Sequence, residues 1–287
     1  MDAIKFGRRE TLAGMASLPL VGCAGARSLA VSPRQVGLGL DALAQRKGRR
    51  FGSAIASTPG HTSAGSIQNP NYVAIIKAEC GLIVPENELK WQATRPGPDA
   101  FDFARMDQIA AWAKANGLEL RGHTLLWHRP QWFPTWLNNY DFGTNPAREA
   151  ERLITTHIRT VTERYRGQIT SYDVVNEAID HDRNAPIETS LSRAMGSPEA
   201  VLDLAFHTAR SQLPTEQLVY NDYMSWEPQH QKHCADVLRL LEGFRKTVNG
   251  QGRHFCGAEG RLLETKLQSA SESSGCQHLR LVRVATN

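Results

Sequence analysis

The sequence predicts an α/β protein built from repeated strand-helix units, and two observations support this. Short apolar segments recur along the chain, and stretches with apolar residues at helical spacing separate them. Polar and aromatic side chains also cluster where four of these apolar segments end. Strands that alternate with helices form a parallel sheet. The expected strands lie near residues 51–56, 81–85, 119–126, 171–176 and 217–222.

Four helices are expected from the apolar spacing. They cover residues 105–115 and 147–165, a segment that starts at Ser197-Pro198, and residues 228–246. Asn116-Gly117 provides a stop for the first of them, and Ser197 a cap for the third. Their apolar faces are assigned to the core and carry no chemistry.

The fourth strand ends in a polar pair, Asn176 and Glu177. In βα-repeat proteins, active sites lie at the carboxyl ends of the strands, so Glu177 is placed for catalysis. The alternative is a structural one, in which Glu177 begins a helix and is favoured there by the helix dipole. The other strand ends favour catalysis.

Those other strand ends carry side chains that suit a sugar. Residues 85–91 read Pro-Glu-Asn-Glu-Leu-Lys-Trp, residues 121–128 read Arg-Gly-His-Thr-Leu-Leu-Trp-His, and residues 221–223 read Asn-Asp-Tyr. Sugar hydroxyls bind to amides, carboxylates, lysine and histidine, and sugar C–H faces pack on aromatic rings. A nucleotide site would need a glycine-rich phosphate loop, which the sequence lacks.

Taken in order with Asp-Val-Val-Asn-Glu-Ala at 173–178, these motifs resemble glycoside hydrolase family 10, the endo-1,4-β-xylanases. The resemblance covers residues 51–246. It implies a (β/α)8 TIM barrel that cleaves β-1,4-linked xylan with retention at the anomeric carbon. By motif position, Glu177 would be the general acid/base and Asn176 would bind the sugar 2-hydroxyl. The remaining implied substrate-binding residues are Glu86, Asn87, Lys90, His123 and Trp127 on the glycone side, and Asn221 and Tyr223 near the cleavage point.

Retention requires a second carboxyl group about 5 to 5.5 Å from the acid/base. Its charge, together with partial burial, is expected to raise the pKa of Glu177. The resemblance places this nucleophile in a Thr-Glu-Leu-Asp-like motif that follows a Gln-x-His strand, and neither occurs after Lys246. The sequence therefore predicts that the nucleophile is missing from this chain.

Only about five βα units are recognisable, all within residues 51–246, whereas a barrel has eight. The 41 residues that follow (287 − 246) show no βα alternation. We therefore expect three segments: an export signal at 1–30, an incomplete barrel at 31–246, and an atypical tail at 247–287 that arises from a shifted or interrupted reading frame. Two alternatives to an active xylanase stay open. One is a catalytically dead xylan-binding protein, and the other is a non-functional truncated product.

The amino terminus predicts export to the periplasm or the cell exterior. Arg8 and Arg9 precede a modestly apolar stretch, which resembles a twin-arginine signal, and residues 20–23 resemble a lipobox with Cys23 as the lipidated residue. Cleavage further on, which would release a free secreted protein, is the alternative. The expected partners are xylan or xylooligosaccharides and, through Cys23, a membrane.

Composition predicts one globular domain after the signal, with 41% hydrophobic residues. The net charge of +4 includes +1 from residues 1–22 and +2 from the tail, so no nucleic-acid partner is expected. No metal or other cofactor is expected either, because histidine pairs such as His230 and His233 lack the spacing of a zinc site. Cys80 and Cys234 are expected as buried or free thiols, and the protein as a monomer. Trp132 and Trp136 are equally suited to stack on a distal xylose or to pack in the core.

Overall fold

Five parallel strands form the sheet of this protein. A computed structural model describes residues 38–59, 65–180, 182–183 and 185–222. The strands are β1 (Gly52–Ile55), β2 (Leu82–Pro85), β3 (Glu119–Trp127), β4 (Ile169–Asn176) and β7 (Gln217–Asn221), in the order β1-β2-β3-β4-β7. All five expected strands are confirmed. The expected export signal with Cys23, the helix expected at 228–246 and the expected tail lie outside the described residues. Tyr223, His230, His233 and Cys234 lie outside them as well.

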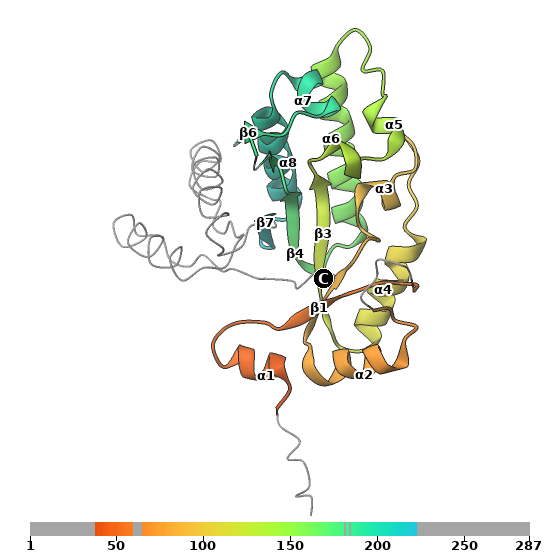
Figure 1. Ribbon diagram of the computed structural model, residues 1–287, viewed down its shortest axis with the longest axis vertical. Helices are drawn as coiled ribbons and strands as arrows, with labels where there is room; N and C mark the ends of the chain where they lie inside the picture. Colours follow the sequence, from red (N-terminus) through yellow and green to blue (C-terminus); the bar gives the residue numbers. More distant parts are fainter. Residues whose placement is uncertain (1–37, 60–64, 181, 184, 223–287) are drawn as a thin grey trace, which may run out of the picture. The chain divides into compact units, whose positions relative to one another are not determined.

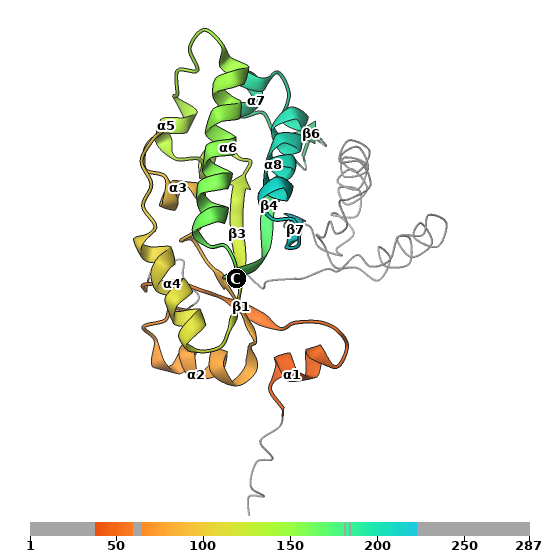
Figure 2. The same cartoon turned by 180° about the vertical axis from the view of Figure 1, so that it is seen from behind.

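Helices connect the successive strands. Because neighbouring strands follow chain order and strand-helix-strand connections are right-handed, the long helices that connect one strand to the next lie on one face of the sheet (Figures 1 and 2). The helices are α1 (Leu40–Gln45), α2 (Pro70–Glu79), α3 (Trp91–Thr94), α4 (Ala104–Ala115), α5 (Thr135–Asn138), α6 (Pro146–Arg164), α7 (Ser190–Met195) and α8 (Pro198–Gln212), with a 3₁₀ turn at Pro130–Trp132. A small antiparallel pair, β5 (Ile179–Asp180) and β6 (Ala185–Pro186), follows β4.

The helix ends follow the local chemistry of the sequence. The Ser197 side chain accepts a hydrogen bond from the amide of Ala200 at 3.1 Å, which confirms it as the cap of α8. The stop expected for α4 is also confirmed, because Gly117 has φ +65°, a backbone conformation that glycine adopts without penalty.

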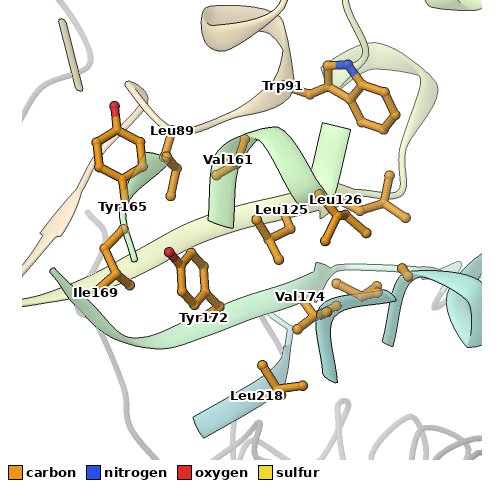
Figure 3. Packing of buried hydrophobic residues seen from close by; sticks show 14 of the residues in the cluster. Leu89, Trp91, Leu125, Leu126, Val161, Tyr165, Ile169, Tyr172, Val174 and Leu218 are labelled. Carbon is orange, nitrogen blue, oxygen red and sulfur yellow. The ribbon is translucent and has the colours of Figure 1, made fainter. Parts of the chain in front are cut away.

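The hydrophobic core lies between the sheet and its helices. Figure 3 shows Leu126 of β3, Val174 of β4 and Leu218 of β7 gathered in one cluster that also includes Val161 of α6. These side chains are almost completely buried. Apolar residues on both strand and helix thus hold each helix against the strand it follows.

The opposite face of β3 and β4 carries buried charge. The Arg121 guanidinium donates to Asp173 Oδ1, and His123 Nδ1 donates to Asp173 Oδ2 at 2.8 Å. Arg121 and His123 are two residues apart, so they lie on the same face of β3. Burial by itself would raise the pKa of Asp173, but the charge of Arg121 and the hydrogen bond from His123 outweigh it and hold that pKa below its ordinary value.

Two further features concern the described part of the chain only. None of its helices combines the length and the apolar character needed to cross a membrane. Cys80 is a buried free thiol, as expected.

Candidate active site

The carboxyl ends of the strands bring the expected site residues to one edge of the sheet. Trp127 at the end of β3 is in register with Asn176 at the end of β4, which is in register with Asn221 at the end of β7. Glu177 follows Asn176, and residues 86–90 follow β2. Segments distant in sequence therefore meet, as the parallel arrangement predicts.

Glu177 leaves β4 in an unusual backbone conformation. Its φ is +49°, in the left-handed region, and its amide donates to the carbonyl oxygen of Asn221 at 2.9 Å. A non-glycine residue held in a sparsely populated region costs of order 1–3 kcal/mol, and such residues cluster at functional sites. The turn directs the chain away from β4 at the residue that bears the carboxyl group.

The Glu177 carboxyl group is partly buried and has a raised pKa. Desolvation is the largest cause and the charge of Asp222 adds to it, whereas a hydrogen bond from Trp127 Nε1 to Oε2 at 3.0 Å and the charges of Arg129 and His123 act in the opposite direction. Desolvation is the larger effect, because removing a carboxylate from water destabilises its charged form more than one hydrogen bond from an indole N–H stabilises it. The group therefore keeps its proton to higher pH than an exposed glutamate.

Trp127 connects Glu177 to the residues that follow β2. Lys90 Nζ lies 4.5 Å from the centre of the Trp127 ring and donates to Asn87 Oδ1 at 2.8 Å. Burial lowers the pKa of Lys90, and the charges of Glu86, Glu177 and Glu88 act against that shift. The charges of Glu86 and Glu177 thus both reach Lys90.

Asn176 and Asn221 form a second pair at this edge. Asn221 Nδ2 donates to Asn176 Oδ1 at 2.8 Å, and Asn176 is almost fully buried. Asn221 therefore holds both residues of the Asn-Glu pair, one through its side chain and the other through its carbonyl oxygen.

His123 is partly exposed, at 18% of its side chain, and its ring centre lies 6.2 Å from that of Trp127. Its Nδ1 is bound to Asp173, so the other ring nitrogen is the one directed to other partners.

The structure thus brings together every expected site residue that it describes, and Tyr223 lies outside the described residues.

The two tryptophans left open between sugar stacking and core packing differ in their surroundings. Trp136 is partly buried and donates from Nε1 to the carbonyl oxygen of Arg95 at 2.9 Å, so it packs with the core. Trp132 is 39% exposed, and its ring lies parallel to that of Trp127 with the centres 4.4 Å apart. Only Trp132 extends the aromatic surface of the site.

Three charged or polar residues of the site were not anticipated from the sequence. Arg129 Nε donates to the carbonyl oxygen of Glu177 at 3.0 Å, and the Tyr220 hydroxyl donates to Asp222 Oδ2 at 2.7 Å. Arg129 falls in a loop, and Tyr220 and Asp222 flank a residue already chosen. The sequence offered one signal for these three residues, their position near the end of a strand. That signal does not distinguish polar residues that support the fold from those that take part in function.

No group of three or more histidine, cysteine or acidic side chains suited to a metal ion occurs among the residues described. The chemistry that this edge of the sheet can support is proton transfer by the Glu177 carboxyl group, beside aromatic, amide and other acidic side chains.

Comparison with known proteins identifies the family. The family model described as glycosyl hydrolase family 10 matches residues 39–262. The chain belongs to glycosyl hydrolase family 10. It is 36% identical over 192 residues to endo-1,4-beta-xylanase 3 of Hypocrea jecorina, an alignment that covers 66% of this chain and 50% of that protein. It is 34% identical over 216 residues to endo-1,4-beta-xylanase A of Fusarium oxysporum, covering 75% of this chain and 62% of the relative.

Solved structures of the family share the fold. Xylanase 10B from Thermotoga petrophila RKU-1, in complex with xylobiose, matches with a TM-score of 0.68 and 20% identity over 85% of this chain and 72% of that one. A psychrophilic family 10 endo-β-1,4-xylanase matches with a TM-score of 0.66 and 22% identity, over 86% and 76% of the two chains. The expected (β/α)8 barrel class is thereby confirmed, with five of its strands in the described residues. The chain spans about half the length of the first curated relative that it matches.

Proposed function

We propose that this protein is an exported, retaining endo-1,4-β-xylanase in which Glu177 is the general acid/base. The observation that carries the proposal is the Glu177 carboxyl group itself. It lies at the carboxyl end of a barrel strand, its pKa is raised by burial, and it touches the indole of Trp127. A protonated carboxyl at that position can give its proton to a glycosidic oxygen as the bond to the sugar breaks.

The surrounding residues have roles that follow from their chemistry. Lys90 and Asn87 offer donors to sugar hydroxyls on the glycone side, with Glu86 and His123 beside them. Trp127, extended by Trp132, offers an apolar surface for the C–H face of a sugar ring. Asn176 is proposed to contact the 2-hydroxyl, and Asn221 and Tyr223 to lie near the cleaved bond.

Retention also requires a nucleophilic carboxylate. No described residue is assigned that role, and the motif that would carry it is expected to be missing from this chain. Asp222 is the carboxylate whose charge raises the pKa of Glu177, but it is buried and accepts the hydrogen bond from Tyr220. Its charge therefore favours the protonated form of Glu177. Export, with lipidation at Cys23, completes the proposal, since xylan is found outside the cell.

Hydrolysis of xylan and binding of xylotetraose by the full chain test this function. Replacing the acid/base by Glu177→Gln is expected to lower the rate on xylan by about 10²- to 10⁴-fold, with affinity for xylotetraose within about threefold of the original. Glu119→Gln is the matched control, because Glu119 lies at the opposite end of β3, where it pairs with Arg50. Full activity in Glu177→Gln would exclude the assignment. Xylotetraose binding by an original chain that does not hydrolyse xylan would support the binding-protein alternative instead.

A further inference from the structure

Arg129 lies against Glu177, although the reaction proposed above gives it no role. It follows β3 by two residues, and its side chain is 17% exposed. Its Nε donates to the carbonyl oxygen of Glu177 at 3.0 Å, and its Nη2 donates to that of Ile179 at 3.1 Å. One planar guanidinium thus binds two carbonyl oxygens on either side of Ala178, directly after the left-handed residue.

The same guanidinium lies near the Glu177 carboxyl group without a hydrogen bond to it. Arg129 Nε is 3.6 Å from Oε2, which is close enough for charge attraction but longer than a hydrogen bond. A guanidinium that also hydrogen-bonded the carboxylate would favour its charged form more strongly than charge attraction alone does. Because Nε is directed at the backbone carbonyl, Arg129 holds the residue in place and leaves the carboxyl able to be protonated.

The segment after β4 is held from the end of β3 at two points. Arg129 binds the start of this segment at the carbonyl oxygen of Glu177. The neighbouring His128 binds it further along, where His128 Nε2 donates to the carbonyl oxygen of Ile187 at 3.0 Å. Between the two carbonyl groups that Arg129 binds, the amide of Ala178 donates to the Tyr220 hydroxyl oxygen at 3.2 Å. The Glu177 turn is thereby fixed relative to both neighbouring strands.

We propose that Arg129 is a positioning residue for the acid/base: it holds the left-handed turn at Glu177 through two carbonyl oxygens and keeps a positive charge beside the carboxyl group. The charge favours the carboxylate that forms after proton donation, when the same group must act as a base. This inference rests on the proposed function only in calling Glu177 the acid/base, since the contacts stand without it.

Charged and polar groups from several elements surround the Glu177 carboxyl group. Trp127, His123 and Arg129 face it from β3 and the residues that follow, Lys90 from the residues after β2, and Tyr220 and Asp222 from the last described strand and the residue after it. Arg129 acts with Trp127 and His123 against desolvation and Asp222. Removing its charge is therefore expected to raise the pKa of Glu177 further.

The test is a carboxyl ¹³C NMR titration of the full chain labelled at glutamate, with the Glu177 signal assigned by its loss in Glu177→Gln. Arg129→Met is expected to raise the titration midpoint, and Arg129→Lys, which keeps the charge, to leave it near the original value. Arg183→Met is the matched control, because Arg183 is an exposed arginine of the same segment that pairs with Asp180 at 3.6 Å. An unchanged midpoint in Arg129→Met, or an equal shift in Arg183→Met, would overturn the charge effect.

Leaving-group dependence tests the positioning. Dinitrophenolate leaves without a proton, whereas a sugar needs one, so Arg129→Lys is expected to lose about tenfold in kcat/KM on xylotetraose and little on dinitrophenyl β-xylobioside. Equal losses on the two substrates, or none on either, would contradict it. A chain that hydrolyses neither substrate refutes the proposed function, while the titration still decides whether Arg129 acts on Glu177.

Discussion

At the scale of single residues, charge burial distinguishes the site from the core beside it. Glu177 is partly buried, and its pKa rises because desolvation outweighs the hydrogen bond from Trp127. Asp173 is fully buried but has two cationic or donor partners, Arg121 and His123, so its pKa falls. Two carboxyl groups four residues apart on one chain thus differ because of the partners that neighbouring strands bring to them. Only the first has its protonated form favoured, as the proposed proton transfer requires.

The buried pair of Arg121 and Asp173 leads to a stability prediction. Asp173→Asn removes the carboxylate but leaves the guanidinium buried at 3% exposure, and is expected to destabilise the fold by about 3–5 kcal/mol. Urea unfolding at pH 7 measures the change. Asp99→Asn provides the control, because Asp99 pairs with Arg152 at an exposed position and should cost at most about 1 kcal/mol. Similar losses in the two variants would show that burial does not set the cost.

At the scale of elements, β3 and β4 pack closely because β3 has no side chain at Gly122. Gly122 is in register with Tyr172, and a Cβ added to it would lie 2.5 Å from Tyr172 Cδ1 and 3.1 Å from Leu89 Cδ2. The Tyr172 ring is fully buried, so it has no room to move away. Glycine usually weakens a strand, but Gly122 is the residue that allows the Tyr172 ring to pack against β3.

Gly122→Ala is expected to destabilise the protein by about 1–3 kcal/mol through overpacking against Tyr172. Gly97→Ala is the matched change, because its Cβ would meet only Ala100 Cβ at 3.7 Å, an ordinary contact, and it should stay within about 0.5 kcal/mol. Thermal unfolding of the two variants side by side measures the difference. Coincident curves would remove the steric explanation.

At the scale of the whole described domain, two buried histidines make stability depend on pH. Burial lowers the pKa of His128 to about 4 and that of His157 well below its ordinary value. The unfolded chain binds protons on both rings below about pH 6.5, whereas the folded chain does not. Their contribution to stability is thus complete above pH 6.5 and is lost as the pH falls from 6.5 toward 4.

The free energy of unfolding, measured in urea from pH 7 to pH 4.5, is expected to fall below pH 6.5. Each histidine contributes a slope of up to about 1.4 kcal/mol per pH unit. His157→Gln should be less stable at pH 7 but show a shallower slope, since one titrating group is gone. A slope that stays the same in that variant would mean that His157 is protonated in the folded protein.

Much of the fold and of the candidate site could be predicted from the sequence, for local reasons. The five strands, the Ser197 cap and the stop at Gly117 depend on residues next to one another in the chain, and so they were predicted correctly. The assembly of Glu177 with Trp127 and Lys90 also followed, because parallel strands bring their carboxyl ends to one edge.

Tertiary structure alone decided the partners of the buried charges. The pairing of Arg121 with Asp173 and the contact of Arg129 with Glu177 join residues 52 and 48 positions apart, and both depend on the register between β3 and β4. The sequence by itself determined the positions of the five strands and of α4, α6 and α8, the site residues other than Arg129, Tyr220 and Asp222, and the resemblance to its family. It did not determine which carboxyl has a raised pKa and which a lowered one, because that depends on desolvation and on charges from other strands, which exist only once the sheet has formed.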